Sequence, residues 1–226
     1  MKQKYFSIAI DGPAGAGKST LARRAAERLG FRYVDTGAIY RTVGYHMALM
    51  GIGPRDADGI RRLIGDVNIK LVWPEDGRQH MILNGFDVTD EIRTPEMSNY
   101  ASCVSALPTV RQELLEMQRS IARENNVIMD GRDIGTVVLP HADVKIFLTA
   151  SDTVRAKRRF DELTAKGERV SLEKVLSDMR QRDRQDSERA AAPLRCAEDA
   201  VRLDTSEMGL DEAEQAIIDI VRRKLG

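Results

Sequence analysis

Residues Gly12 to Ser19 read GPAGAGKS and fit the pattern G-x-x-x-x-G-K-[S/T] at every position. A strand-like apolar run precedes this phosphate loop and an amphipathic helical pattern follows it, which is the context the pattern requires. Glycines let successive backbone N–H groups point into one concave anion site, and the N-terminus of the next helix adds partial positive charge. The alternative is a glycine-rich turn that binds nothing.

The loop predicts binding of a nucleoside triphosphate with Mg²⁺ as cofactor. Lys18 would reach the β- and γ-phosphates, and the hydroxyl of Ser19 could ligate the metal. Asp130 ends an apolar run further along the chain, a position suited to a carboxylate that binds Mg²⁺ through water. The residues expected to contact ATP are Gly12, Pro13, Ala14, Gly15, Ala16, Gly17, Lys18, Ser19 and Thr20.

The loop does not by itself separate a kinase from a GTPase or a motor ATPase. The guanine-reading motif [N/T]-K-x-D is not present, and the 226 residues leave no room for a long mechanical domain. A small-molecule kinase fits the length best. A nucleotide-dependent switch that binds a protein partner is the rival from another class.

Arginines follow two of the predicted strands, where ligands of open α/β sheets bind. Arg41 lies in DTGAIYR after the second strand, beside Tyr40 and downstream of Thr36, which could cap the helix. Arg132 and Asp133 lie in MDGRDIGT after the third strand. Arginine is permanently charged and grips phosphate with two parallel donors, so these positions suit an anionic acceptor. A mutual surface salt bridge between Arg132 and Asp133 is the alternative.

Two later helical stretches each place charged residues on one face. Arg155, Arg158 and Arg159 are spaced i, i+3, i+4, and Arg182, Asp186 and Arg189 are spaced i, i+4, i+7. They flank the segment LTAKGERVS, which suggests a lid that closes over phosphates and excludes water. An ordinary solvated face is the alternative for either stretch.

Short apolar runs alternate with helical patterns along most of the chain. The predicted strands are residues 6–10, 32–34, 127–129, 144–148 and 201–203, and helical spacing recurs in residues 21–29, 110–121 and 213–221. This alternation predicts an α/β fold with a parallel sheet covered by helices on both faces. From about 66 to 93 two strand-like runs joined by PEDG predict a small antiparallel insert, with a surface loop as the alternative. Thr94 and Pro95 should start one helix, and Pro108 the next.

The composition excludes several classes of protein. Lysine plus arginine equal aspartate plus glutamate at 35 each, which argues against nucleic-acid or membrane-surface binding. The two cysteines are far apart and form neither a disulfide framework nor a zinc motif. The first residues contain no run long enough for a signal peptide, and no run could span a bilayer. We therefore expect a reduced, cytoplasmic, soluble protein.

The motifs taken together resemble the bacterial-type cytidylate kinases, nucleoside monophosphate kinases that phosphorylate CMP and dCMP. The resemblance runs nearly end to end, through IDGPAGAGKST, DTGAIYR, EIRT, DGRDIGTVV, VKIFL, RDRQD and AAPL in that order. It implies a three-layer P-loop kinase core with a five-stranded parallel sheet, an enlarged monophosphate-binding region and a helical lid. The whole chain, 1–226, would be one kinase unit: core 1–35, 103–150 and 190–226, monophosphate-binding region 36–102, and lid with flanking helices 151–189.

The resemblance also implies roles for individual residues. Ser102 and Arg111 would contact cytosine, and Asp133 would accept from its amino group. Arg41, Arg132 and Arg189 would grip the acceptor phosphate, while Arg182 and Asp186 lie near the sugar. Arg155, Arg158 and Arg159 belong to the lid. The full acceptor set is Thr36, Tyr40, Arg41, Ser102, Arg111, Arg132, Asp133, Arg182, Asp186 and Arg189, and the catalytic set is Lys18, Arg132, Arg155, Arg158 and Arg159.

The expected reaction is in-line transfer of the γ-phosphoryl group of ATP to CMP or dCMP by a monomer. A kinase for another acceptor, such as UMP, AMP or a hydroxyl metabolite, stays open. His46, His80 and His141 share no spacing typical of metal ligands, and we expect packing or surface roles for them.

Overall fold

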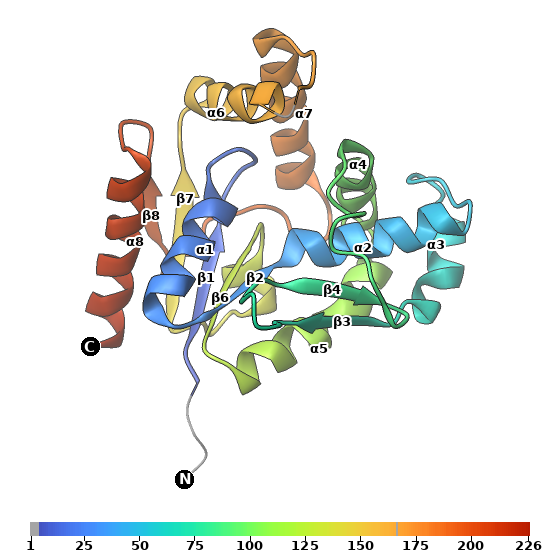
Figure 1. Ribbon diagram of the computed structural model, residues 1–226, viewed down its shortest axis with the longest axis horizontal. Coiled ribbons are helices and arrows are strands. Elements are labelled where there is room, and N and C mark those ends of the chain that lie inside the picture. Colours follow the sequence, from blue (N-terminus) through green and yellow to red (C-terminus); the bar gives the residue numbers. More distant parts are fainter. Residues whose placement is uncertain (1–4, 166) are drawn as a thin grey trace. The chain divides into compact units, whose positions relative to one another are not determined.

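The computed structural model describes residues 5–165 and 167–226 and divides into two compact units (Figure 1). One unit joins the chain up to Arg32 with Asn125–Gly226, and the other is Tyr33–Glu124. The first unit carries the phosphate loop, and the second carries the predicted antiparallel insert. The predicted assignment of core, monophosphate-binding and lid segments stays a prediction.

The main sheet has five strands, and all five were predicted from the sequence. They are β1 Ser7–Asp11, β2 Arg32–Asp35, β6 Val127–Gly131, β7 Val144–Thr149 and β8 Val201–Asp204, in the spatial order β2-β6-β1-β7-β8. β1 pairs in parallel with both β6 and β7, and its residues Ile8 and Ile10 are fully buried. Such continuous apolar runs are typical of parallel strands covered on both faces. The α/β class and the parallel sheet are therefore confirmed.

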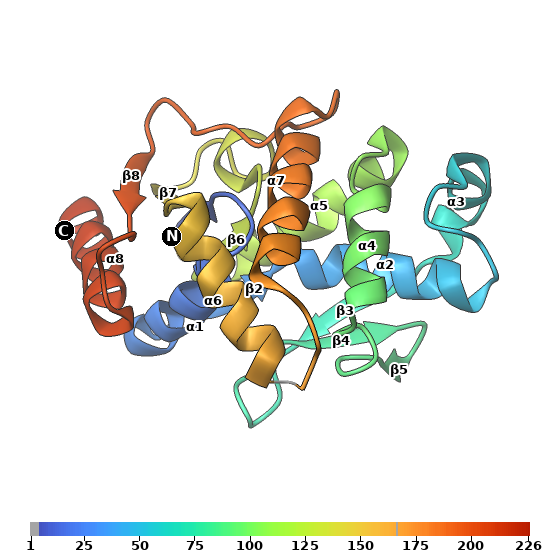
Figure 2. The same cartoon turned by 90° about the horizontal axis from the view of Figure 1, so that it is seen from above.

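The helices of the first unit begin and end at recognisable signals. They are α1 Lys18–Leu29, α6 Asp152–Ala165, α7 Leu172–Glu188 and α8 Leu210–Leu225, with one π-helical turn at Ile134–Val138. α1 ends at Gly30, whose left-handed conformation lets the N–H of Phe31 bond back to the carbonyl of Ala26 at 2.9 Å. α6 and α7 lie side by side in both views (Figures 1 and 2) and share a small apolar core that includes Met179.

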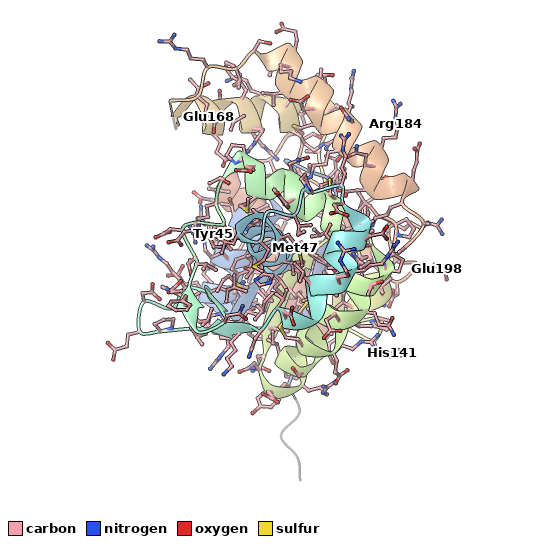
Figure 3. All side chains as sticks on the ribbon, turned by 90° about the vertical axis from the view of Figure 1, so that its right-hand side faces the viewer. Tyr45, Met47, His141, Glu168, Arg184 and Glu198 are labelled. Carbon is pink, nitrogen blue, oxygen red and sulfur yellow. The ribbon has the colours of Figure 1, made fainter. Side chains whose placement is uncertain are left out.

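The second unit packs helices against a small antiparallel sheet. Its helices are α2 Thr36–Leu49, α3 Ala57–Leu63, a 3₁₀ turn at Ile64–Asp66, α4 Pro95–Val104 and α5 Pro108–Glu124. The sheet consists of β3 Ile69–Val72, β4 His80–Leu83 and β5 Phe86–Asp87. α2 supplies Met47, fully buried in the core of this unit, and Tyr45, partly buried against it (Figure 3). The antiparallel insert is confirmed.

Several local predictions are also settled. Thr94 caps α4, its hydroxyl accepting from the N–H of Met97 at 3.1 Å, and Pro108 begins α5, as predicted. The prediction that Thr36 caps α2 is wrong, because β2 runs one residue further and Asp35 is the cap. Its carboxylate accepts from the N–H of Ala38 at 2.9 Å, and Thr36 becomes the first helical residue.

Candidate active site

The phosphate loop leaves the carboxyl end of β1 and requires glycine at two positions. Gly12 has φ +150°, and a Cβ there would lie 1.9 Å from the carbonyl oxygen of Leu148 on β7. Gly15 has φ +70°, and its Cβ would meet the Met179 side chain at 2.7 Å. A side chain at either position would strain the backbone and displace its neighbours. The glycines thus allow the close turn that a concave anion site needs.

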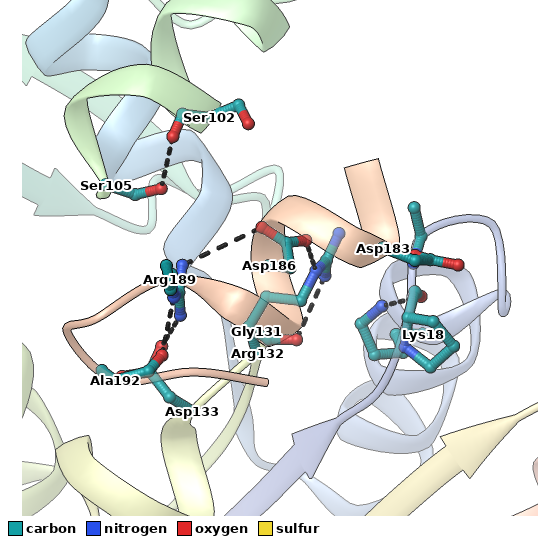
Figure 4. A network of polar contacts seen from close by, with 12 residues as sticks. Lys18, Ser102, Ser105, Gly131, Arg132, Asp133, Asp183, Asp186, Arg189 and Ala192 are labelled. Atoms are coloured by element: carbon teal, nitrogen blue, oxygen red, sulfur yellow. Dashed lines mark hydrogen bonds and ion pairs between the residues drawn. The ribbon is translucent and has the colours of Figure 1, made fainter. Parts of the chain in front are cut away.

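Lys18 starts α1 and points back across the loop. Its side chain is buried, and its ammonium donates to the carbonyl of Pro13 at 2.7 Å (Figure 4). Burial lowers the pKa of Lys18 well below its usual value, and the charge of Arg132 lowers it further. A triphosphate in the loop would offset both effects, because it places negative charge beside the ammonium.

Ser19 and Asp130, the two predicted metal-binding residues, are in direct contact. The hydroxyl of Ser19 donates to the carboxylate of Asp130 at 2.8 Å. Asp130 lies on β6 and is buried, paired in register with Ile10 of β1. Two hard oxygen donors adjacent at the phosphate loop form a donor set that suits Mg²⁺.

Asp11 joins the end of β1 to the segment that follows β6. Its buried carboxylate accepts from the N–H of Ile134 at 2.8 Å and of Gly135 at 2.7 Å. Burial raises the pKa of Asp11 to about 6, although these two N–H groups act in the opposite direction. The contact fixes the π-helical turn that directly follows Arg132 and Asp133.

Arg132 and Asp133 each form an ion pair with a residue at the C-terminal end of α7. Arg132 donates to Asp186 at 2.8 Å, and Arg189 donates to Asp133 at 2.9 Å (Figure 4). Burial disfavours the charged form of both Arg132 and Asp186. The partner's charge outweighs this effect, so the pKa of Arg132 is raised and the pKa of Asp186 is lowered. The structure thus brings together four of the predicted acceptor residues within the first unit.

The prediction that Arg189 shares a helical face with Arg182 and Asp186 is wrong. α7 ends at Glu188, and Arg189 is the C-cap residue in an extended conformation. Its side chain turns back to the carbonyl of Ala192 at 2.6 Å as well as to Asp133. The face predicted from i, i+4, i+7 spacing therefore holds only Arg182 and Asp186, because the chain leaves the helix first.

The three arginines of α6 lie in different surroundings. Arg155 is buried and donates to the carbonyls of Ala14 and Ala150 and to two carboxylates. Arg158 donates to the hydroxyl of Thr205 at 3.1 Å and to its carbonyl at 2.8 Å. Arg159 pairs with Glu162 one turn further along the helix. Arg155 thus belongs to the interior, and Arg158 and Arg159 to the wall of a cavity.

That cavity, of about 420 Å³, opens between the phosphate loop and the start of α8. Gly17 and Thr20 line it from the loop, and Met208 and Leu210 supply apolar surface from the segment before and at the start of α8. The planar guanidinium of Arg158 forms another wall. A flat aromatic ring can stack on such a guanidinium and rest on the apolar side chains.

In the second unit, α2, α4 and α5 carry five of the predicted acceptor residues, whereas Arg182 lies on α7 of the first unit. Asp35 holds Arg41 at 2.8 Å, and the guanidinium of Arg111 lies 5.6 Å from the ring centre of Tyr40. Arg111 also donates to the carbonyl of Ser105, whose hydroxyl bonds to the carbonyl of Ser102 (Figure 4). Within this unit the structure therefore brings together Tyr40 and Arg111, with Ser102 one contact away.

A family model described as cytidylate kinase matches residues 8–223, almost the whole chain. The chain belongs to the cytidylate kinase family. This confirms the resemblance inferred from the motifs and makes the chain a member of a kinase family.

Curated relatives named cytidylate kinase match over nearly their full length. One from Carboxydothermus hydrogenoformans is 50% identical over 96% of this chain and 97% of its own. One from Geobacillus kaustophilus is 47% identical over 99% and 100%, and one from Bacillus subtilis 44% identical over 98% and 99%. A crystal structure of an uncharacterized protein from Eubacterium ventriosum superimposes with a TM-score of 0.54 at 12% identity, covering 96% of this chain and 98% of that one. At that identity the likeness concerns the fold alone.

Across 5–165 and 167–226, no three His, Cys, Asp or Glu side chains gather in a way that could hold a metal ion. His46 is buried in α2, His80 pairs with Asp76 and Asp87, and His141 is exposed before β7 (Figure 3). None of the helices in these ranges has the length and apolar character needed to cross a bilayer.

Sequence reasoning missed two features of the first unit. The apolar cavity wall at Met208 and Leu210 follows β8, and only the loop position after a predicted strand could have pointed to it. Asp183, next to Arg182 in RDRQD, bonds to the N–H of Ala14 at 3.0 Å. No local pattern indicates that contact, because the two residues lie 169 positions apart.

Proposed function

We propose that this chain transfers the γ-phosphoryl group of ATP to CMP and dCMP, giving ADP and CDP or dCDP. The observation that carries the proposal is the contact of Ser19 with Asp130 beside Lys18, on a loop whose glycines leave a concave anion site. Membership of the cytidylate kinase family supplies the acceptor.

The donor would occupy the loop and the adjoining cavity. Backbone N–H groups between Gly12 and Thr20 would bind the phosphates, and Lys18 would exchange its bond to Pro13 for phosphate oxygens. The adenine ring would enter the 420 Å³ cavity, between Arg158 and the side chains of Met208 and Leu210.

Ser19 and Asp130 would hold Mg²⁺, Ser19 directly and Asp130 through water. Bound there, the ion would neutralise part of the charge on the phosphates. The residues fit this role because the hydroxyl and the carboxylate already lie 2.8 Å apart. Mg²⁺ prefers oxygen ligands and usually takes few of them from the protein.

The acceptor phosphate would be gripped by Arg41, Arg132 and Arg189, and the cytosine ring read by Ser102, Arg111 and Asp133. Thr36 and Tyr40 would line the site, and Arg182 and Asp186 would contact the sugar. These roles rest on the family resemblance.

Transfer would need positioning and charge neutralisation but no general base, because a phosphate oxygen of CMP is already anionic. Lys18, Arg132, Arg158 and Arg159 would stabilise the charge of the transferring group, and such an arginine can contribute ~10³-fold. Arg155 belongs to the proposed catalytic set as well, and its contacts with Ala14 and Asp183 favour action through the phosphate loop.

Selectivity tests the acceptor. In an assay coupled to ADP release, CMP and dCMP should be turned over fastest and UMP far more slowly. A carboxylate at Asp133 accepts from the amino group of cytosine and repels the carbonyl of uracil, and such a site can reject the analogue by ~10⁴. UMP turned over as well as CMP would contradict this assignment and favour a broader pyrimidine kinase.

Replacing Arg132 by alanine tests the phosphate grip. Turnover should fall by more than about tenfold, because the substitution removes a cation from the transferring group. A smaller loss would contradict the role of Arg132. ATP consumption that CMP does not stimulate would instead favour the nucleotide switch.

The proposal also includes the oligomeric state and the location of the protein. Light scattering should find a monomer, and we propose a cytoplasmic location without a nucleic-acid partner.

A further inference from the structure

Ala14, in the middle of the phosphate loop, has both of its backbone polar groups held by side chains of α6 and α7. Its N–H donates to the carboxylate of Asp183 at 3.0 Å, and its carbonyl accepts from the guanidinium of Arg155 at 2.7 Å. Ala14 is itself buried. Two helices more than a hundred residues away therefore determine the conformation of this one loop residue.

The contact of Asp183 determines the direction of the peptide unit between Pro13 and Ala14. In a trans peptide the N–H and the carbonyl point in opposite directions, and the described residues contain no cis peptide. With the N–H of Ala14 directed at Asp183, the carbonyl of Pro13 points to the other side of the loop. There it accepts from the ammonium of Lys18 at 2.7 Å.

The contact of Arg155 determines the direction of the next peptide unit in the same way. Because Arg155 holds the carbonyl of Ala14, the N–H of Gly15 must point away from Arg155. The N–H groups of a phosphate loop act by pointing together into the anion site. The orientation of the N–H of Gly15 therefore depends on a bond made on the opposite side of its peptide unit.

Asp183 and Arg155 also fix each other. Their side chains pair at 2.6 Å and are mostly buried, with 19% and 5% of the side-chain surface exposed. Arg155 donates further to the carbonyl of Ala150 at 3.0 Å and to Asp152 at 2.6 Å. A carboxylate beside a phosphate site would repel the ligand if it were unpaired. Here the guanidinium and the N–H of Ala14 offset its charge.

We propose that Asp183 is a positioning residue for the donor phosphates, acting through the N–H of Ala14 and the guanidinium of Arg155. It keeps two successive peptide units in opposite orientations, so that the loop presents the Gly15 N–H to the triphosphate. The inference rests on the proposed function, since it assigns Asp183 to the donor site of that reaction. The alternative is that Asp183 only ties α7 to the loop and contributes to stability.

Calorimetric binding of ATP and of tripolyphosphate tests the inference. Asp183→Ala should weaken both ligands by about tenfold or more, equally for the two, because the loss concerns the phosphate loop and not the cavity. It should raise KM for ATP while KM for CMP changes by less than about twofold. Asp183→Asn should lie between, since its amide oxygen still accepts from Ala14 but no longer pairs as an anion with Arg155.

Asp178→Ala is the matched control. Asp178 lies on the same helix, is exposed and pairs with Lys174 one turn before it, so ligand binding should not change. A purely structural role would lower the unfolding midpoint of Asp183→Ala without changing tripolyphosphate binding by the folded fraction. That result overturns the inference, as does tighter binding or a loss confined to ATP.

If Asp183→Ala does not fold, Asp183→Asn decides the question by the same comparison. Wild-type protein provides the check on the underlying reaction. If it fails to bind tripolyphosphate or to phosphorylate CMP, the proposed function is wrong. If it does both and the Asp183 variants match it, the function stands and the inference is wrong.

Discussion

Replacing Asp11 by asparagine is expected to make the protein more stable relative to wild type as pH rises from about 4 to 7. The carboxylate is 5% exposed and accepts two backbone N–H bonds from the turn after Asp133. Burial penalises its charged form, and raises its pKa from 3.8 to about 6. Asparagine has nearly the same shape and stays neutral at every pH, but its amide nitrogen cannot accept, so one of the two N–H bonds is lost at every pH.

The size and sign of the effect follow from linkage. Between about pH 4 and 6 the folded protein binds a proton at Asp11 that the unfolded chain has released, so stability falls as pH rises through this window. A difference of about 2 pKa units corresponds to about 3 kcal/mol. The variant lacks this loss, so its stability relative to wild type should grow by up to about 3 kcal/mol between pH 4 and 7.

Urea unfolding of both proteins at a series of pH values measures the effect. The difference in unfolding free energy between variant and wild type removes the contribution of the groups that do not interact with Asp11. Asp199→Asn provides a control of opposite sign. Asp199 is exposed, and the ammonium of Lys145 at 2.8 Å lowers its pKa, so wild type should lose stability relative to that variant as pH falls.

A difference that stays flat, or that shifts toward wild type as pH rises, would refute the reasoning. It would mean that the N–H bonds of 2.8 and 2.7 Å outweigh burial and hold the carboxylate in its charged form. The measurement therefore decides which of two opposing effects dominates at this position.

Three further predictions concern single positions. Gly12→Ala should destabilise the protein by more than about 3 kcal/mol in thermal unfolding, since its Cβ would lie 1.9 Å from the Leu148 oxygen at φ +150°. Ser19→Ala should lower kcat at least about tenfold and raise the Mg²⁺ concentration needed for half-maximal rate, because it removes the hydroxyl bonded to Asp130. His80→Gln should lower the melting temperature at pH 5.5 but not at pH 9. Bonds to Asp87 and Asp76 raise the His80 pKa above 6.5, so the stabilisation is complete below that pH and lost as pH rises through the raised value.

The phosphate loop and the five strands could be predicted because their signals are local. Neighbouring residues alone are enough to recognise the phosphate loop, through Gly12, Lys18 and the apolar runs on either side. Buried parallel strands likewise need no distant information, since their continuous apolar composition already implies that both faces are covered.

Predictions failed where two local signals compete. Asp35 and Thr36 are both good caps, and the extra residue of β2 decided for Asp35. The third strand, β5, was missed although Asn84 and Gly85 precede it, a pair typical of tight hairpins; both have positive φ. A two-residue strand is too short to give a periodicity of its own.

Contacts between residues far apart in the sequence could not be predicted from local sequence patterns. Asp183 sits in a helix so rich in charge that one buried carboxylate cannot be told from a solvated one. Its partners, Ala14 and Arg155, lie 169 and 28 positions away. Helical spacing groups residues that share a face, but it does not say which face is buried. Arg155 and Arg158 were therefore placed together, although one is interior and the other lines a cavity.

The arginines assigned to the acceptor phosphate already hold carboxylates: Arg41 pairs with Asp35, Arg132 with Asp186, and Arg189 with Asp133. A buried guanidinium without a partner would cost several kcal/mol, so folding requires such pairs. A phosphate would have to exchange with these carboxylates or share the arginines with them, and its charge and two parallel acceptors make that favourable.

The same carboxylates then become acceptors with fixed positions. The resemblance assigns Asp186 to a ribose hydroxyl and Asp133 to the amino group of cytosine, and both groups are hydrogen-bond donors. One set of ion pairs would thus compensate the buried guanidinium charges during folding, and the same residues would later bind the phosphate, the sugar and the base. Asp133→Asn should therefore affect two steps together, weakening the hold on Arg189 as well as the discrimination between CMP and UMP. A variant that lost discrimination while binding the CMP phosphate unchanged would separate the two roles and contradict this coupling.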